Sequence, residues 1–145
     1  MSILPIFIPH AGCPHQCVFC NQKTISGQKL AAVAAAEEQL ARWRSWLRPS
    51  AANEAAFYGG SFTGLPLELQ EELLALTDAL LAEGFIGSVR LSTRPDYIDE
   101  ERLQLLQRHG VRLVELGVQS LDDRVLAAAE RGHTAAQVAP AVTLL

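Results

Sequence analysis

All three cysteines of this 145-residue chain fall within one short stretch near the N-terminus. They are Cys13, Cys17 and Cys20, with the spacing C-x3-C-x2-C. Three thiolates on one loop can hold three irons of a cubane [4Fe–4S] cluster and leave the fourth iron without a protein ligand. Such an open iron offers a place for a small molecule to bind and react. The cysteine stretch therefore predicts a metal centre around which the rest of the chain is organised.

Other uses of these cysteines stay open from the residues alone. A structural zinc site normally takes four nitrogen or sulfur ligands, and His10 or His15 would supply the fourth. A disulfide framework is disfavoured because the number of cysteines is odd and because the apolar start, residues 3–8, is too short for a signal peptide. We therefore predict a reducing location, the cytoplasm, which iron–sulfur ligation also requires.

Composition fits one globular domain over residues 1–145, because 49% of the residues are hydrophobic. No apolar run approaches the roughly eighteen residues that cross a bilayer, so we expect no membrane partner. The net charge of −4 argues against nucleic-acid binding over the whole surface. A local basic patch stays open as a weaker hypothesis, formed by the cations that follow the cysteines: Lys23, Lys29, Arg42, Arg44 and Arg48.

Apolar runs and helical periodicity alternate along the chain. Four short apolar or alternating runs are predicted as strands: residues 3–8, 55–58, 89–93 and 111–120. The segments between and after them are predicted as helices: residues 29–47, 66–84, 99–109, 122–132 and 134–145. Pro140 should kink or break the last of these. This alternation indicates an α/β fold with a parallel sheet, whose first strand is expected to be covered on both faces.

Each predicted strand ends in residues that could serve a site. These are the cysteines after the first strand, Gly59 and Gly60 after the second, Ser92 and Arg94 at the end of the third, and Gln119 at the end of the fourth. Because ligands of parallel α/β sheets bind beyond the carboxyl ends of the strands, we expect these residues to converge. Period two along the fourth strand places Glu115 and Gln119 on one face, where Glu115 would be a buried acid that needs a partner.

Five stretches of the sequence together resemble one known family. They are residues 8–22 with the cysteines, FYGGSFTG (57–64), STRPD (92–96), VELGVQSLDD (114–123) and RGHT (131–134). The cysteine spacing, with Phe19 before the last cysteine, resembles the signature of the radical S-adenosylmethionine (radical SAM) superfamily. In this order the five stretches resemble its Elongator catalytic-subunit branch. A looser resemblance extends to oxygen-independent coproporphyrinogen oxidase-like proteins.

The resemblance implies a fold, two cofactors and a reaction. In this superfamily a partial (β/α)6 barrel, similar to part of a TIM barrel, holds a [4Fe–4S] cluster and S-adenosylmethionine in its mouth. Cys13, Cys17 and Cys20 are implied to bind three irons, while the methionine amine and carboxylate of the cofactor chelate the fourth. One electron then cleaves the sulfur–C5′ bond, which yields methionine and a 5′-deoxyadenosyl radical that abstracts hydrogen from a substrate.

Further cofactor-binding residues are predicted at the mouth of this barrel. Gly59 and Gly60 lack a Cβ, so the backbone can approach the methionine end of S-adenosylmethionine. Gln119 fits a ribose contact, and Arg131 matches the family's arginine that pairs with the cofactor carboxylate. The remaining predicted contacts are an aromatic ring beside the cluster or adenine, two hydroxyls and one guanidinium: Phe19, Ser61, Ser92 and Arg94.

The sequence also departs from the family. Ser61 stands where the superfamily often has an acid. Only about four barrel strands are predicted and no acetyltransferase domain, so we expect residues 1–145 to be an N-terminal, incomplete portion of the core domain. The substrate is open, with tRNA as a candidate, and the expected partners are a reductant such as flavodoxin or ferredoxin and a chain that completes the barrel. The competing hypothesis is an inactive fragment or a module that holds zinc or a cluster for structure or docking.

Overall fold

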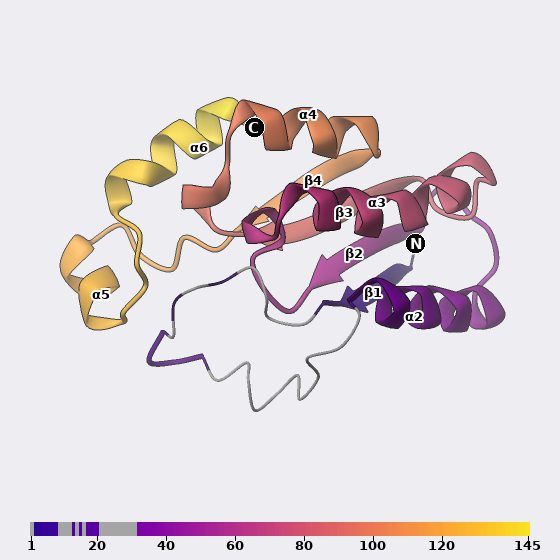
Figure 1. Ribbon diagram of the computed structural model, residues 1–145, viewed down its shortest axis with the longest axis horizontal. Coiled ribbons are helices and arrows are strands. Elements are labelled where there is room, and N and C mark those ends of the chain that lie inside the picture. The colour runs from indigo at the N-terminus through magenta and orange to yellow at the C-terminus, as the bar shows by residue number, and fades with distance from the viewer. Residues whose placement is uncertain (1, 9–12, 14, 16, 21–31) are drawn as a thin grey trace.

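The computed structural model describes residues 2–8, 13, 15, 17–20 and 32–145 (Figure 1). Its four strands are β1 (Ile3–Phe7), β2 (Glu54–Tyr58), β3 (Ser88–Thr93) and β4 (Val111–Leu116). All pair in parallel in the order β1-β2-β3-β4, so each strand lies beside its neighbour in the chain. Helices follow the strands: α2 (Ala32–Trp46), α3 (Leu67–Ala82), α4 (Glu100–Arg108), α5 (Asp123–Ala128) and α6 (Val138–Leu144). The predicted α/β fold with parallel strands in βα order is confirmed.

Some sequence-based predictions fall outside the described residues. The predicted start of the first helix at residue 29 is one of them, and the helix is described from Ala32. His10, Lys23 and Lys29 also lie outside the described residues, so their proposed roles as ligand or cations stay predictions.

One face of the sheet forms the hydrophobic core. Alternate strand residues point to this face, and Ile6, Phe57 and Leu91 have no exposed surface there. The helices α2, α3 and α4 supply the opposite side of the same cluster with Leu40, Leu73, Leu74, Leu105 and Leu106. Among the described residues, no helix covers the end of β1 on the other sheet face, as the 60% exposure of Phe7 shows. The expectation that the first strand is covered on both faces is therefore wrong.

The outer edge of β1 is closed by side chains of α2. The amide of Gln39 accepts a hydrogen bond from the Phe7 backbone N–H (2.8 Å) and donates one to the Phe7 carbonyl (3.1 Å). The indole N–H of Trp43 donates to the Pro5 carbonyl (2.9 Å). These bonds satisfy backbone groups that would otherwise be an open sheet edge.

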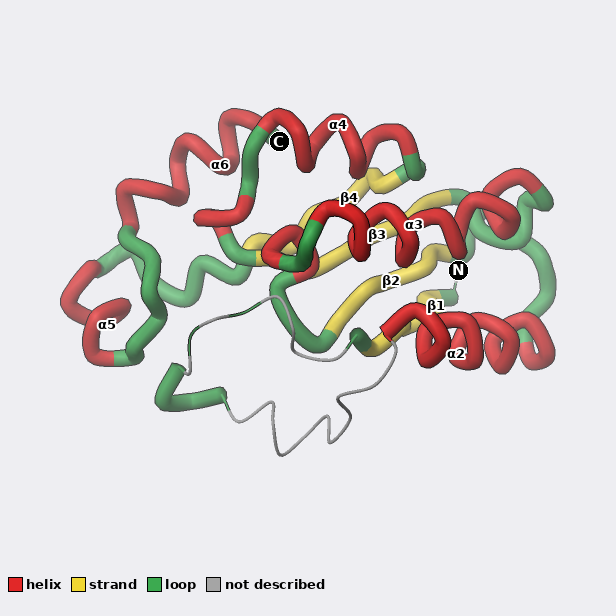
Figure 2. The backbone as a smooth tube through the Cα atoms, viewed as in Figure 1, coloured by secondary structure: helices red, strands yellow, loops and turns green. Residues whose placement is uncertain are grey.

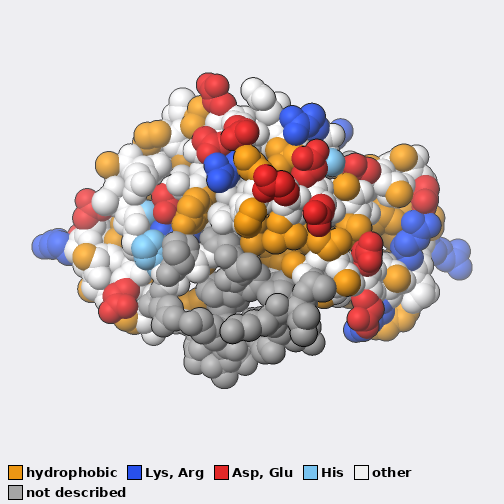
Figure 3. Space-filling model, viewed as in Figure 1, with side chains coloured by type: hydrophobic (Ala, Val, Ile, Leu, Met, Phe, Trp, Pro, Cys, Tyr) orange, Lys and Arg blue, Asp and Glu red, His pale blue; other side chains and the backbone are white. Residues whose placement is uncertain are grey.

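The arginines of α2 lie beside acidic side chains. Arg42 pairs with Glu38 at 3.1 Å, and Arg44 pairs at 2.7 Å with Glu83, the residue that follows α3. All four side chains are exposed. In Figure 3 acidic side chains lie across the face in view over α3 and α4. Arg42 and Arg44 are thus paired surface charges, which weakens the hypothesis of a local basic patch on α2.

β4 is shorter than predicted. It ends at Leu116, and the strand expected to reach Ser120 is replaced by a tight turn. The Gly117 N–H still donates to the Thr93 carbonyl (2.7 Å), but the N–H groups of Val118 and Ser120 donate to carbonyls two residues earlier, each at 2.9 Å. Gln119 has a positive φ of 68°, which no strand residue adopts. Local turn bonds therefore end the strand early.

The C-terminal segment contains Pro140 without a break. Residues Ala135–Gln137 form a 3-10 turn, whose start is closed by reciprocal bonds between Thr134 and Gln137. α6 begins at Val138, so Pro140 lies in the first helical turn, where a backbone N–H has no partner to lose. The prediction that Pro140 kinks or breaks the helix is therefore wrong, because the helix starts just before it.

The loops that matter for a site gather at one end of the sheet. Figure 2 shows loops and turns collected at the carboxyl ends of the strands, beside the cysteine segment and α5. Asp99 and Asp122 cap the helices α4 and α5 by accepting backbone N–H groups of Arg102 and Arg124, as the sequence predicts. Among the described residues, no helix has the length and apolar character needed to span a membrane.

Candidate functional site

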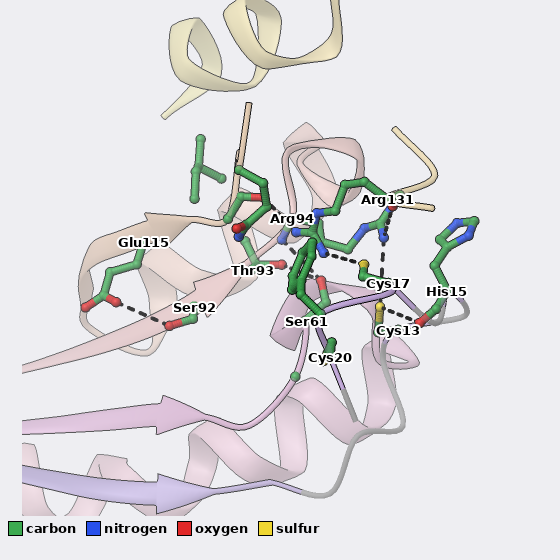
Figure 4. Close-up of a pocket in the computed structure, with 15 residues that line it drawn as sticks. Cys13, His15, Cys17, Cys20, Ser61, Ser92, Thr93, Arg94, Glu115 and Arg131 are labelled. Atoms are coloured by element: carbon green, nitrogen blue, oxygen red, sulfur yellow. Dashed lines mark hydrogen bonds between the residues drawn. The ribbon is translucent and has the colours of Figure 1, made fainter. Parts of the chain in front are cut away.

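A cavity of about 370 Å³ lies beyond the carboxyl ends of the strands (Figure 4). This volume falls within the usual range of small-molecule sites. The residues that line it come from the cysteine segment, the three strand ends and the turn after α5: Cys13, His15, Cys17, Phe19, Cys20, Gly60, Ser61, Ser92, Thr93, Arg94, Glu115, Leu116, Gly117, Gln119 and Arg131. The cavity brings together all three cysteines and the predicted cofactor-binding residues except Gly59.

The cysteine segment rests on the turn that follows α5. Cys17 is buried, Cys13 and Cys20 are half-buried, and all three thiols are free. The Val18 N–H donates to the Ala129 carbonyl (3.2 Å), and the Cys20 N–H donates back to the Cys17 carbonyl (2.9 Å). Phe19 between them is 58% exposed and stands at the rim of the cavity. Residues more than a hundred positions apart thus hold the segment in place.

Arg94 is a buried guanidinium beside the first cysteine. It is 2% exposed, and its Nη1 donates to the Arg131 carbonyl (2.7 Å) and to Cys13 Sγ (3.8 Å). Its Nε and Nη2 form two parallel bonds to the carboxylate of Asp96, at 2.8 and 2.7 Å. Burial raises the pKa of the Asp96 carboxyl, but the hydrogen bonds and charge of Arg94 outweigh burial and hold that pKa below its usual range.

Arg131 is a second buried guanidinium, beside Cys17. Its Nη1 donates to Cys17 Sγ (3.6 Å) and its Nη2 to the Gly117 carbonyl (2.6 Å). The Nε of Arg131 is buried and has no hydrogen-bond partner. A Cβ on Gly117 would stand 3.0 Å from Arg131 Nη2, so the glycine makes room for this side chain. Arg131 therefore keeps an unused donor in a site whose other contacts are fixed.

Three hydroxyls join the second and third strand ends. Ser61 Oγ shares a hydrogen bond with Thr93 Oγ1 (2.9 Å) and accepts one from the Arg94 backbone N–H (3.2 Å). Thr63 bonds to the same Thr93 hydroxyl. The sequence predicts a cofactor contact for Ser61 but none for Thr93 or Thr63, although these two lie within the STRPD and FYGGSFTG stretches, because the sequence does not show that their hydroxyls meet.

Glu115 is paired with Arg90, as expected for an acid that needs a partner. Its side chain is 40% exposed rather than buried, and it bonds to the guanidinium of Arg90, which also reaches Glu54 at 3.2 Å. Ser92 donates to the same carboxylate at 3.3 Å, so the predicted cofactor contact Ser92 faces Glu115 across the cavity wall (Figure 4). Burial, followed by the charge of Glu115, raises the pKa of the neighbouring Tyr58 hydroxyl.

The two glycines after β2 have different settings. Gly59 has a φ of 101°, and a Cβ there would stand 2.7 Å from the Ile8 carbonyl. Its freedom therefore serves the close approach of the β1 and β2 ends. Gly60 lines the cavity, as predicted for a glycine that lets backbone meet a ligand.

Two histidines lie close to the cysteine segment. His15 packs over Gly132, where a Cβ would meet the imidazole at 2.3 Å, so this glycine seats the ring. His133 is 4% exposed and neither ring nitrogen has a hydrogen-bond partner. Burial, and then the charge of Arg131, lowers the pKa of His133, so the ring is held neutral. Within the described part of the chain, no three His, Cys, Asp or Glu side chains are grouped to hold a single metal ion.

The comparison with known families decides the assignment. The profile of the radical SAM superfamily matches residues 7–145, which is nearly the whole chain. The chain belongs to the radical SAM superfamily. The match includes every residue that lines the cavity, so the cysteine segment and the strand ends described above form the family's own core region.

Individual relatives agree with this assignment. An uncharacterized protein of Methanocaldococcus jannaschii is 27% identical over 143 residues, which cover 90% of this chain and 44% of that protein. Elongator complex protein 3 of Saccharomyces cerevisiae is 30% identical over 103 residues, 59% of this chain and 18% of that protein. The tRNA uridine(34) acetyltransferase of Dehalococcoides mccartyi is 44% identical over 55 residues, 38% of this chain and 12% of that protein. The chain spans less than half the length of these relatives.

A solved structure shows the same fold. The archaeal Elp3 of Methanocaldococcus infernus, with its N-terminus deleted, superposes with a TM-score of 0.62 at 18% identity, over 97% of this chain and 34% of that chain. The four parallel βα units therefore match part of the partial barrel of that protein's radical SAM core. Together with the family match over residues 7–145, these comparisons confirm the radical SAM superfamily and the distant similarity to the Elongator catalytic subunit.

Proposed function

We propose that residues 1–145 form the cofactor-binding portion of a radical SAM enzyme core, which binds a [4Fe–4S] cluster and S-adenosylmethionine. The observation that carries this proposal is that the three cysteines and the guanidinium of Arg131 border one cavity. Each cysteine of a cubane site binds a different iron, so the three thiols need to surround a shared space rather than converge on one point. The free thiols and the unpartnered Nε of Arg131 suit such an occupant.

Each residue has a definite part in this proposal. Cys13, Cys17 and Cys20 hold three irons, and Arg131 receives the carboxylate of S-adenosylmethionine with its free Nε. The bound cofactors supply reductive cleavage to a 5′-deoxyadenosyl radical that abstracts hydrogen from the substrate. Phe19, Gly60, Ser61, Ser92 and Gln119 border the same cavity and would contact the bound cofactor. Of the other two predicted contacts, Gly59 does not line the cavity, and Arg94 lines it with its donors bound within the protein.

The position of Phe19 and Gln119 supports this arrangement. Phe19 stands at the rim with its ring exposed, where it can lie against the cluster or an adenine. Gln119 lines the same cavity beside Gly117, so its amide can reach ribose hydroxyls. Glu115 and Ser92 form the wall that is shared with the uncovered sheet face, and we place the substrate on that side.

The partners follow from the relatives' names and from the chemistry. Relatives of this chain include tRNA uridine(34) acetyltransferases, so tRNA is our candidate substrate. The reaction needs one electron from a reductant such as flavodoxin or ferredoxin in a reducing cytoplasm. A further chain or segment that completes the barrel would cover the uncovered sheet face.

The test is anaerobic reconstitution of the chain with iron and sulfide, followed by metal and sulfide analysis. We expect about four iron and four sulfide per chain, and 5′-deoxyadenosine after addition of S-adenosylmethionine and dithionite. Cys17→Ser should lose both, while Ser45→Ala, an exposed serine on α2, should keep both. Zinc without sulfide in the unsubstituted chain would contradict the proposal and identify a structural metal module.

A further inference from the structure

Arg94 uses its donors inside the protein rather than offering them to the cavity. Its Nε and Nη2 are bound to Asp96, and its Nη1 is shared between the Arg131 carbonyl and Cys13 Sγ. The side chain is 2% exposed. This pattern differs from that of Arg131, which keeps its Nε unpartnered. Of the two arginines, Arg131 is therefore the one equipped to receive a ligand carboxylate.

We propose that Arg94 is a positioning residue that acts on the metal centre through Cys13 and raises the reduction potential of the cluster bound there. The proposal rests on the function proposed above and assigns Arg94 a task other than binding S-adenosylmethionine. Asp96 is part of the device, because its two bonds fix the plane of the guanidinium and so aim Nη1 at Cys13.

The physical basis is the charge that the reduced cluster gains. One electron enters without a proton and without a change in bonding, so the thiolate-bound centre becomes more negative by one unit. A guanidinium that donates to a coordinating sulfur stabilises the more negative state more strongly, and hydrogen bonds to cluster sulfurs are a known determinant of potential. Little water screens this contact, because Arg94 is buried and Cys13 is half-buried.

The two arginines make the cluster's surroundings asymmetric. Arg94 reaches Cys13 and Arg131 reaches Cys17, at 3.8 and 3.6 Å. Among the described residues, Cys20 has no such cation bonded to its sulfur. Arg131 would lose part of its contact with Cys17 if it turned toward a cofactor carboxylate, whereas Arg94 is held by Asp96 and would keep its contact with Cys13. Arg94 is therefore the constant contribution to the potential.

The experiment is an EPR-monitored redox titration of the reconstituted full chain without S-adenosylmethionine. Arg94→Met combined with Asp96→Asn removes the donor without leaving a buried carboxylate unpaired. We expect the ratio of reduced to oxidised cluster at a fixed potential to fall about tenfold, a shift of about 59 mV to more negative values for a one-electron couple. Asp96→Asn alone keeps the donor and one acceptor oxygen for the guanidinium, so it should lower the potential less than the double variant does.

A matched control is available on the surface. Arg124 and Asp122 form the same pair two residues apart, and Arg124 has a side chain that is 91% exposed. Arg124→Met combined with Asp122→Asn should leave the potential unchanged, since this pair does not border the cavity. Asn is chosen as the replacement for Asp122 because it also caps a helix well.

Each result bears on the proposal in one direction. A potential in the Arg94→Met/Asp96→Asn variant equal to that of the surface control would overturn it, as would an equal drop in Asp96→Asn alone. If circular dichroism shows that the double variant folds but it holds no cluster, the cluster potential of Arg94→Lys is measured instead. A cluster of intermediate potential in Arg94→Lys supports the proposal, and loss of the cluster there as well contradicts it. An unsubstituted chain that forms no cluster contradicts the proposed function itself, whereas an unshifted potential contradicts this inference alone.

Discussion

The two faces of the sheet carry opposite kinds of side chain. On the face that α2, α3 and α4 cover, Ile6, Phe57 and Leu91 are completely buried. On the other face, Arg90 joins the carboxylates of Glu54 and Glu115, and Phe7 is largely exposed. Neighbouring residues of one strand thus belong to different environments. The covered face therefore stabilises the fold, whereas charged and polar side chains gather on the uncovered face and at the strand ends.

The uncovered face is polar but its charges are not free. Arg90 lies between two acids, and Tyr58 and Ser92 add hydrogen bonds to Glu115. Partners inside the network reduce the cost of holding charges at a half-buried surface. This face therefore presents a fixed set of hydrogen-bonding groups and not a hydrophobic surface.

The largest effect that separates the faces should come from β2. Phe57→Ala removes a ring with no exposed surface and should lower the free energy of unfolding by about 3–5 kcal/mol. The matched control is the next residue, Tyr58→Phe, which removes only a hydroxyl on the other face and should cost less than about 1 kcal/mol. Urea unfolding followed by circular dichroism measures both, and equal losses would refute the division into two faces.

A smaller effect should come from the charged network. Arg90→Met removes the cation between Glu54 and Glu115 and should cost about 1–2 kcal/mol, since the two carboxylates then repel each other. Arg42→Met, which removes an exposed partner of Glu38 on α2, should change stability by about 0.5 kcal/mol or less. Urea unfolding followed by circular dichroism measures both effects. Arg90→Met and Arg42→Met with equal effects would mean that the network adds nothing beyond a surface pair.

The smallest effect should be a pH dependence at His133. Its pKa in the folded chain is lowered by burial and by Arg131, so the unfolded chain binds a proton first as pH falls below about 6.5. Its contribution to stability is therefore complete above that pH and is lost toward acid pH. Between pH 7.5 and 5.5 the unfolding free energy of the original chain should fall more than that of His133→Gln. Parallel pH profiles would contradict the neutral buried ring.

The sequence carries much of the fold because alternation and periodicity are local signals. The strand Ser-Val-Arg-Leu-Ser-Thr of β3 alternates as a sheet with one polar face should, and Asp99 and Asp122 mark the helix starts they occupy. The end of β4 was not predictable in this way, because it depends on turn bonds around Gln119 that no pattern reveals. The effect of Pro140 was predicted wrongly because it depends on where the helix begins.

The residues that line the cavity could be predicted where residue type and spacing indicate their chemistry. The cysteines and the strand-end residues were found because their order along the chain maps onto one end of a parallel sheet. The bond from Arg94 to Cys13 joins residues 81 positions apart, and the Thr93 hydroxyl cluster has no signature in sequence. Such contacts come from packing between elements and are visible only in three dimensions.

EPR spectroscopy of the reconstituted, dithionite-reduced chain, with and without S-adenosylmethionine, tests directly whether the cavity binds both the cluster and the cofactor. If the three cysteines leave one iron open, the chain should give a cubane-cluster signal whose g-values change when the cofactor is added. Arg131→Met should keep the signal and weaken the change, since the free Nε is lost. A cluster signal that is indifferent to S-adenosylmethionine in the unsubstituted chain would contradict the claim that this cavity is a working cofactor site.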